Sequence, residues 1–338
     1  MTSFLKACRG EKTDYTPIWL NRQAGRYMPE YHKLKGNRSS LEFFTNPELA
    51  AQAALDAQRI LDVDAAIVFA DLLPILIPMG LKLDYVAGVG PVIDNPIRDP
   101  KDVDALQLVP AQEGTGYIAE TVRNILQELP SRASLIGFAG APFTLAAYAI
   151  EGRGSQNYTL AKRFMYKHPE SWFSLLDKLS LAVRDYLNLQ INSGVHAVQV
   201  FDSWVGCLAS YEYFKYVAPA TKSLFSGIHS SVPKIYFATG NQHLLVSMYE
   251  TGPDFLALDW RVPMASTWEK IGCPAIQGNM DPIALCADPE LVLSHAKRIL
   301  DDVGGRPGHI FNLGHGIVPQ TPVDNVKLLV DYVHSVTR

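Results

Sequence analysis

Short apolar runs recur along the whole chain, and each is nearly continuous in its apolar content. Such runs are typical of strands buried on both faces of a parallel sheet, whereas half-exposed strands alternate apolar and polar residues. The sequence therefore predicts eight strands, at Thr16–Arg22, Ala65–Asp71, Ser134–Gly140, His196–Ser203, Pro233–Gly240, Phe255–Trp260, Ala275–Asp281 and His309–Gly316.

Segments with helical spacing of apolar residues lie between these runs. Pro47–Leu61 is rich in alanine, and Asn46 precedes it as a candidate cap, with Pro47 at the first helical position. Further helices are predicted at Pro169–Asn192, Asp288–Asp301 and Pro322–Val336, the last two opening on Asp-Pro and Thr-Pro.

The alternation of strand and helix predicts the fold class. Strands interleaved with helices pair in parallel, and eight such units in 338 residues favour an α/β protein that forms a single (β/α)8 TIM barrel. No linker or low-complexity segment interrupts residues 1–338, so we expect one domain. An open, doubly wound sheet is the alternative.

Two connections are longer than a barrel loop requires. Gln23–Asn46 follows the first predicted strand and Leu72–Gly116 follows the second. Within the latter, Gly80–Ile97 has the pattern of a hairpin with its turn at Gly88–Gly90. In a barrel these loops open on the C-terminal face, where we expect the active site.

Composition narrows the class of protein. Hydrophobic residues make up 48% of the chain and charged residues 19%, which is typical of a folded protein with a large core. The net charge of −4 argues against a nucleic-acid partner. The longest apolar stretch, Ala65–Leu81, contains Asp71 and two prolines, so no membrane association is expected. The four scattered cysteines and the absence of an apolar leader predict a cytoplasmic protein.

Seven of the eight predicted strands end in polar residues, and the exception is Ser134–Gly140. In a barrel these side chains point into the mouth, although some polar residues there cap the following helix instead. The residues concerned are Asn21, Arg22, Asp71, Asp202, Ser203, Thr239, Asp259, Asn279, Asp281, Asn312 and His315.

The segment after the first strand is basic in an acidic protein. It contains Arg22, Arg26, Lys33, Lys35 and Arg38, opposed only by a single glutamate. Arginine suits two-point recognition of carboxylate or phosphate, so the segment predicts an anionic ligand, against the alternative of a solvated basic loop.

Three further residues are candidates for chemistry. Asp71 ends the most apolar strand, and a carboxylate in such surroundings must be paired or functional. His315 lies between two glycines that leave its imidazole free to face the mouth. Tyr148 follows the third strand on an apolar helix, where packing is the ordinary role of a tyrosine. No phosphate-binding loop, metalloprotease motif or dinucleotide fingerprint is present.

Several of these motifs resemble a known family. R-Q-A-G-R-Y-M-P-E-Y at Arg22–Tyr31 and G-F-A-G-A-P-F-T-L-A-A-Y at Gly137–Tyr148 are similar to the two signatures of uroporphyrinogen decarboxylases. F-A-D at Phe69–Asp71, F-D-S at Phe201–Ser203 and F-N-L-G-H-G at Phe311–Gly316 also match, as does G-N-M-D-P at Gly278–Pro282. The resemblance runs from about Phe4 to the end of the chain.

This resemblance implies a cofactor-free and metal-free barrel enzyme, usually a homodimer, that removes carboxyl groups from the acetate arms of a cyclic tetrapyrrole. It implies that Asp71 faces the pyrrole nitrogens of the bound substrate. It implies substrate contacts by Arg22, Gln23, Ala24, Gly25, Arg26, Tyr148, Phe201, Ser203 and His315. Lys35 stands where some members carry an arginine. Arg22, Arg26, His315 or a water molecule would supply the proton.

Two other functions remain open. Corrinoid-dependent methyltransferases have a related barrel, but they bind zinc through His and Cys, and this chain has no H-x-C motif. A non-catalytic tetrapyrrole-binding protein is the second alternative.

Overall fold

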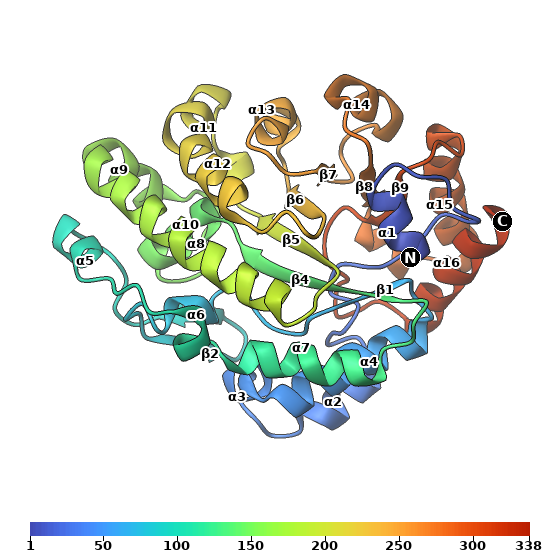
Figure 1. Cartoon of the computed structure of the whole chain (residues 1–338), viewed down its shortest axis with the longest axis horizontal. Coiled ribbons are helices and arrows are strands. Elements are labelled where there is room, and N and C mark those ends of the chain that lie inside the picture. Colours follow the sequence, from blue (N-terminus) through green and yellow to red (C-terminus); the bar gives the residue numbers. More distant parts are fainter.

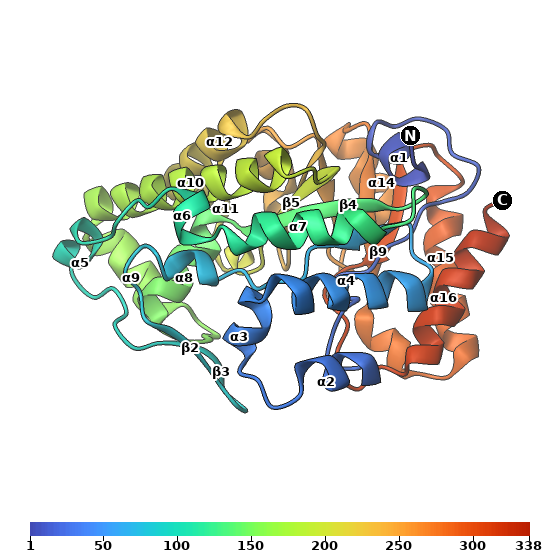
Figure 2. The ribbon, with the colours of Figure 1, turned by 60° about the horizontal axis from the view of Figure 1, so that its bottom comes forward.

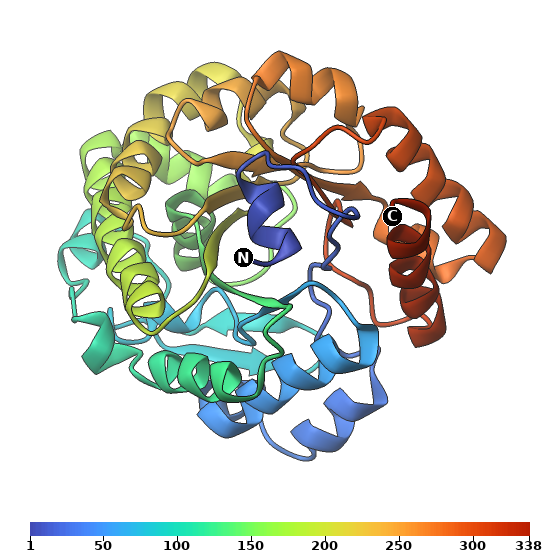
Figure 3. The same cartoon turned by 45° about the vertical axis from the view of Figure 1, so that its right-hand side comes forward.

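A computed structural model describes all 338 residues. Its main sheet has seven parallel strands that are hydrogen-bonded in chain order, and the sheet curls around a central axis with helices outside it (Figures 1 and 3). The strands are β1 (Ala65–Ile67), β4 (Ser134–Gly140), β5 (Ala197–Asp202), β6 (Lys234–Ala238), β7 (Phe255–Ala257), β8 (Ile276–Met280) and β9 (His309–Leu313). The parallel pairing confirms the predicted barrel class and excludes the doubly wound order.

The predicted first strand, Thr16–Arg22, is not a strand in the structure. Its backbone still lies between β9 and β1, because Phe311 N–H donates to Pro17 O at 2.8 Å and Asp64 N–H donates to Ile18 O at 2.9 Å. Pro17 has no N–H, and the N–H of Ile18 donates to the Asp64 carboxylate at 2.8 Å instead of to a neighbouring strand. This segment therefore fills the eighth position with only a single ladder bridge, Ile18 to Phe311.

The predicted helices follow local signals closely. Pro47–Leu61 and Pro169–Asn192 are helices over the predicted ranges, and the Asn46 side chain accepts from Leu49 N–H at 3.0 Å, which confirms the cap. The last helix begins one residue later than expected, with Pro322 as its cap. Helices of eight or more residues are α4 (Pro47–Leu61), α7 (Tyr117–Glu128), α8 (Pro142–Glu151), α9 (Thr159–Lys167), α10 (Pro169–Asn192), α12 (Ala218–Gly227), α14 (Met264–Ile271), α15 (Pro289–Val303) and α16 (Val323–Val336). Shorter helices are α1 (Ser3–Cys8), α2 (Pro29–Lys35), α3 (Ser40–Thr45), α5 (Pro100–Asp104), α6 (Ala111–Gly114), α11 (Ser210–Tyr216) and α13 (Leu245–Tyr249).

The first long connection and the hairpin of the second lie along the same side of the molecule, at the bottom of Figure 2. The first contains α2 and α3, and a capping box between Ser39 and Glu42 begins α3. The second contains the predicted hairpin, with β2 (Leu83–Val86) paired antiparallel to β3 (Gly90–Ile93). Ile93 N–H donates to Gly152 O at 2.7 Å, so the hairpin is fixed to the end of α8.

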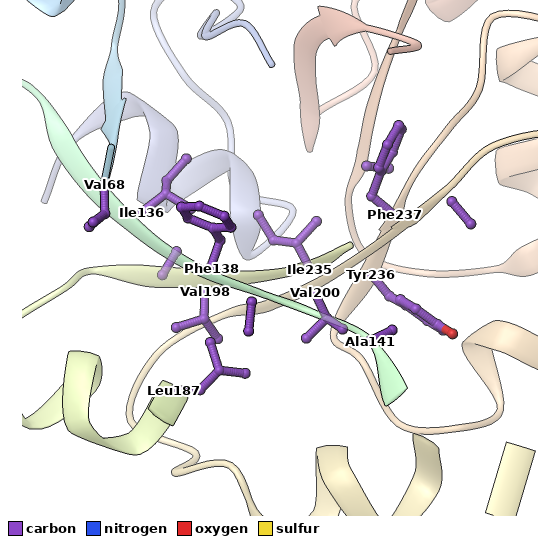
Figure 4. Packing of buried hydrophobic residues seen from close by; sticks show 14 of the residues in the cluster. Val68, Ile136, Phe138, Ala141, Leu187, Val198, Val200, Ile235, Tyr236 and Phe237 are labelled. Carbon is purple, nitrogen blue, oxygen red and sulfur yellow. The ribbon is translucent and has the colours of Figure 1, made fainter. Parts of the chain in front are cut away.

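The barrel interior is packed, with both apolar and polar side chains. Phe138 of β4, Val200 of β5 and Phe237 of β6 belong to one apolar cluster (Figure 4). A buried polar chain crosses the same interior, where Trp19 Nε1 donates to Gln277 and Gln277 Nε2 donates to Gln199 at 3.0 Å. None of the helices combines the length and the apolar character needed to cross a bilayer.

Candidate active site

Polar residues at the strand ends form two groups. The larger group braces the loops, because each member bonds to backbone or to another side chain nearby: Asn21, Asp202, Thr239, Asp259, Asn279, Asp281 and Asn312. For these residues the interpretation as caps and braces applies. Arg22, Asp71, Ser203 and His315 have no such complete set of partners, and they remain candidates for the mouth of the barrel.

Asp202 shows how this bracing positions a candidate residue. Its buried carboxylate accepts from Thr144 Oγ1 at 2.6 Å and from the Tyr236 hydroxyl at 2.7 Å. Burial raises the pKa of Asp202 to about 6, although these donors oppose part of the rise. The bonds attach the first turn of α8 to the end of β5. The position of Tyr148, which also lies on α8, is therefore fixed relative to β5.

Arg22 lies at the end of the segment that fills the eighth barrel position. Its backbone is left-handed, with φ at 63°, which turns the chain away from the barrel directly after the Asn21 position. A Cβ at Gly316 would lie 2.4 Å from Arg22 Cδ, so glycine there allows the arginine side chain to pack on the loop after β9. The charge of Arg22 influences the pKa values of Asp71, Tyr148 and His315, so each of these three groups lies within electrostatic reach of Arg22.

Asp71 is a carboxylate among phenols. Burial raises its pKa above the ordinary value, while the Leu73 N–H at 3.1 Å, the Tyr85 phenol and the charge of Arg22 oppose that rise. The Tyr85 hydroxyl is buried and has no partner within hydrogen-bond distance. Burial first, and then the Asp71 charge, raise the pKa of Tyr117 to about 12. The arrangement places one negative charge on a half-buried carboxylate among phenols.

His315 lies two residues beyond the end of β9. Burial and the nearby charge of Arg22 lower its pKa, so the imidazole is neutral near pH 7. Its ring packs edge-on against Trp260, with 6.3 Å between ring centroids. A neutral imidazole can donate one hydrogen bond and accept another, which suits a polar ligand better than a fixed cation would.

The remaining aromatic candidates have defined packing. Tyr148 stacks on Trp204 with centroids 3.7 Å apart, and Ser203 immediately precedes that tryptophan. Phe201 lies on β5 between Phe138 and Phe237, with centroid distances of 5.7 and 5.5 Å. Phe201, Ser203 and Tyr148 are each half-buried, so part of every side chain faces open space.

The basic segment separates into structural and exposed parts. The Gln23 amide is buried and fully engaged, accepting from Leu20 N–H and donating to Ala65 O. A side chain at position 25 would be too close to the backbone, because a Cβ there would lie 2.9 Å from Arg22 O. Ala24 beside it is half-buried. Arg26 and Lys35 form no side-chain hydrogen bond or ion pair within the protein.

Three residues near the site had no local signal in the sequence. Tyr85 stands on the hairpin, Trp204 follows Ser203, and Arg261 follows the end of β7. In its own segment, none of the three belongs to a pattern that predicts a role beyond packing or surface exposure. Only the fold brings them to Asp71, Tyr148 and His315 respectively.

The rest of the molecule offers two observations about alternative sites. No three or more His, Cys, Asp or Glu side chains are grouped so that they could hold a metal ion. A groove of about 740 Å³ lies at the opposite, N-terminal end of the barrel, between Thr16 and the loop that leads into His309. It contains none of the predicted site residues.

Solved structures share this fold. A methyltransferase from Methanosarcina mazei superposes with a TM-score of 0.84 at 20% identity, covering 99% of this chain and 98% of that one. A B12-independent methionine synthase from a Shewanella species superposes with a TM-score of 0.58 at 12% identity, covering 97% of each chain. At these identities the likeness shows the barrel fold alone.

Similarity in sequence is far closer and extends over the whole chain. The family model for uroporphyrinogen decarboxylase matches residues 1–336. A uroporphyrinogen decarboxylase from Sorangium cellulosum is 45% identical over 337 residues, covering 99% of this chain and 96% of that protein. Another from Chloroflexus aggregans is 47% identical over 338 residues, covering 98% and 95%. The chain therefore belongs to the uroporphyrinogen decarboxylase family.

Proposed function

We propose that this protein is a cofactor-independent carboxy-lyase of porphyrin biosynthesis, with residues 1–338 acting as one barrel unit. It removes carbon dioxide from the four acetate side chains of uroporphyrinogen III, leaving methyl groups and giving coproporphyrinogen III. The observation that carries this proposal is the whole-chain family match, together with a half-buried carboxylate, Asp71, within electrostatic reach of Arg22.

The chemistry explains why a single buried anion is central. Loss of carbon dioxide from a carbon attached to a pyrrole needs an electron sink, and protonation of the ring supplies one. The electrons of the broken C–C bond neutralise the protonated ring and leave an exocyclic methylene, which takes up a second proton to become the methyl group as the ring releases its own. The protonated ring is a cation, and Asp71 would stabilise it as a preorganised anion in a site of low dielectric. The same carboxylate would accept from the pyrrole N–H groups, so it both orients the ring and compensates its charge.

Arginine supplies the complementary charge. The substrate carries eight carboxylates, and Arg22 and Arg26 are exposed, with guanidinium groups that form no hydrogen bond or ion pair within the protein. We assign them to carboxylate binding, with Lys35 as a more distant point charge. Tyr148, Phe201, Ser203 and His315 complete the pocket wall, while Gln23, Ala24 and Gly25 hold the turn that presents Arg22.

The direct test is turnover. The purified protein is incubated with uroporphyrinogen without air, and the products are oxidised and separated by chromatography. Coproporphyrinogen formation supports the proposal. Tight binding without any decarboxylation would support a non-catalytic tetrapyrrole-binding protein instead.

For the assembly, we propose a cytoplasmic homodimer. An exposed aromatic surface supports it, because Tyr211 and Phe214 of α11 are 67% and 71% exposed. Phe173 of α10 extends this surface, since its ring stacks on Tyr216 of α11 with 6.0 Å between centroids. Exposed apolar patches of this kind mark interfaces, and two-fold pairing is the commonest closed arrangement.

Light scattering at several concentrations tests the dimer. Phe214→Glu should yield a monomer, whereas Leu291→Glu on α15, which also replaces an exposed apolar residue, should leave the mass unchanged. A wild-type chain that is monomeric at every concentration would refute the homodimer.

A further inference from the structure

Arg261 is a half-exposed cation at the mouth of the barrel. It follows the end of β7, on the same side as Asp71 and His315, and its side chain is 54% exposed. It has no part in the decarboxylation chemistry proposed for Asp71. Its side chain is nevertheless held more firmly than an ordinary surface arginine.

Two contacts fix the guanidinium. Nη1 donates to Asp259 Oδ2 at 2.5 Å, and the guanidinium carbon lies 3.7 Å from the centroid of the Trp260 ring. The backbone N–H of Arg261 also donates to Asp259 Oδ1 at 2.9 Å. Because the contacts restrain both position and plane, little side-chain entropy remains to be lost when a ligand binds.

Asp259 is itself held in place. Its side chain is only 1% exposed, and Oδ2 also accepts from Gly240 N–H at 2.8 Å. The loop after β9 presses on the same turn, because a Cβ at Gly314 would lie 2.2 Å from Trp260 N. The guanidinium is therefore built on a rigid base rather than on a mobile loop.

Most of the donors of Arg261 remain free. A guanidinium carries five N–H donors, and the protein uses one of them, on Asp259. The Trp260 ring beneath it packs edge-on against His315, so the guanidinium stands at the rim of the candidate site. A structural ion pair alone does not require a stacked, half-exposed guanidinium at this place.

We propose that Arg261 binds a carboxylate of the substrate that the reaction leaves in place. The inference rests on the proposed function, because uroporphyrinogen keeps four carboxylates after four are lost. An ion pair to a departing carboxylate would weaken as carbon dioxide leaves, so it would stabilise the ground state and slow the reaction. A rim arginine on a retained carboxylate stabilises ground state and transition state equally.

This assignment predicts a distinct kinetic signature. Arg261→Gln should raise KM for uroporphyrinogen about tenfold, which corresponds to one charge-assisted hydrogen bond, and leave kcat within about twofold. Dissociation constants for the product coproporphyrinogen should rise by the same factor, since the product retains the bound group. Arg261→Lys should give an intermediate effect, because it keeps the charge and loses the fork.

Arg132→Gln is the matched control. Arg132 is also a half-exposed arginine, 49% exposed, paired with Asp62, but it lies at the N-terminal ends of β1 and β4. The Arg132→Gln substitution removes the same charge as Arg261→Gln does, but from the opposite end of the barrel. If Arg261→Gln does not fold because Asp259 loses its partner, Arg261→Lys carries the comparison, since Lys can still pair with Asp259.

The outcomes separate the two proposals. Equal effects of Arg261→Gln and Arg132→Gln would refute a specific role and indicate diffuse attraction of an anionic substrate. A fall in kcat, or weaker substrate binding without weaker product binding, would also refute it. A wild-type protein that never decarboxylates uroporphyrinogen would overturn the proposed function and this inference together.

Discussion

Replacing Asp71 by Asn isolates the charge that the proposed mechanism requires. The change preserves the shape and one oxygen acceptor, so the bond from Leu73 N–H can persist. Two unit charges about 4 Å apart interact by about 4 kcal/mol at an effective dielectric of about 20. Loss of one preorganised electrostatic partner commonly costs about 3 kcal/mol, or roughly a hundredfold in rate. We therefore expect kcat to fall by at least about a hundredfold, while substrate still binds.

The stability of the same variant should move in the opposite sense. Burial raises the pKa of Asp71, so the folded state holds the proton more strongly than the unfolded state does. The contribution of this group to stability is then greatest below its unfolded pKa and is lost as pH rises through the folded pKa. At neutral pH the buried charge costs stability, and Asp71→Asn should melt at the same temperature or higher.

The assay pairs steady-state decarboxylation with thermal unfolding for Asp71→Asn and for a control, Asp84→Asn. Asp84 is an exposed carboxylate on the nearby hairpin strand β2, and its replacement should change neither quantity. A collapsed melting temperature with near-normal turnover in the folded fraction would mark Asp71 as a structural ion-pair partner and remove it from the mechanism.

Other expectations follow from particular contacts. Arg22→Lys should reduce kcat/KM about tenfold or more, well beyond Lys33→Ala, because it removes the fork and keeps the charge; equal losses would mean a diffuse basic surface. Gly316→Ala should lower kcat/KM by displacing Arg22, whereas Gly154→Ala, which meets nothing within 4 Å, should not; equal activities would contradict this packing. Dialysis against a strong chelator should leave turnover unchanged, and loss restored by zinc would refute the metal-free mechanism. Burial lowers the pKa of His309 to about 4. The contribution of His309 to the free energy of unfolding is therefore complete above about pH 6.5, and it falls by up to about 3 kcal/mol toward pH 4. Urea unfolding across that range should show a slope that His309→Gln flattens.

Much of the architecture could be predicted from local patterns. Ser134–Gly140 is a strand over the predicted range, and all seven of its residues are buried. A continuous apolar run of this kind is visible within the segment itself. The Asn46 cap and the Pro47 start of α4 are also local, since the bonds involved span three residues. The hairpin at Gly80–Ile97 follows from glycines whose φ angles are positive at Gly88 and Gly90.

Other features depended on segments far apart in the chain. Thr16–Arg22 has the composition of a strand, yet Asp64 takes the Ile18 N–H, and no pattern within either segment indicates that. The polar strand ends look alike in sequence, but Asp202 and Asp259 brace loops while Asp71 remains among phenols.

The sequence by itself determined the family, the βα order and the identity of the main candidates, because signatures, periodicity and caps act over a few residues. Only the tertiary structure decided which polar groups face one another. Tyr85 meets Asp71, Trp204 stacks on Tyr148, and Arg261 is fixed beside His315 because strands distant in the chain end at one rim. Hydrogen bonding, burial and charge depend on distance in space, and a linear sequence does not record that distance.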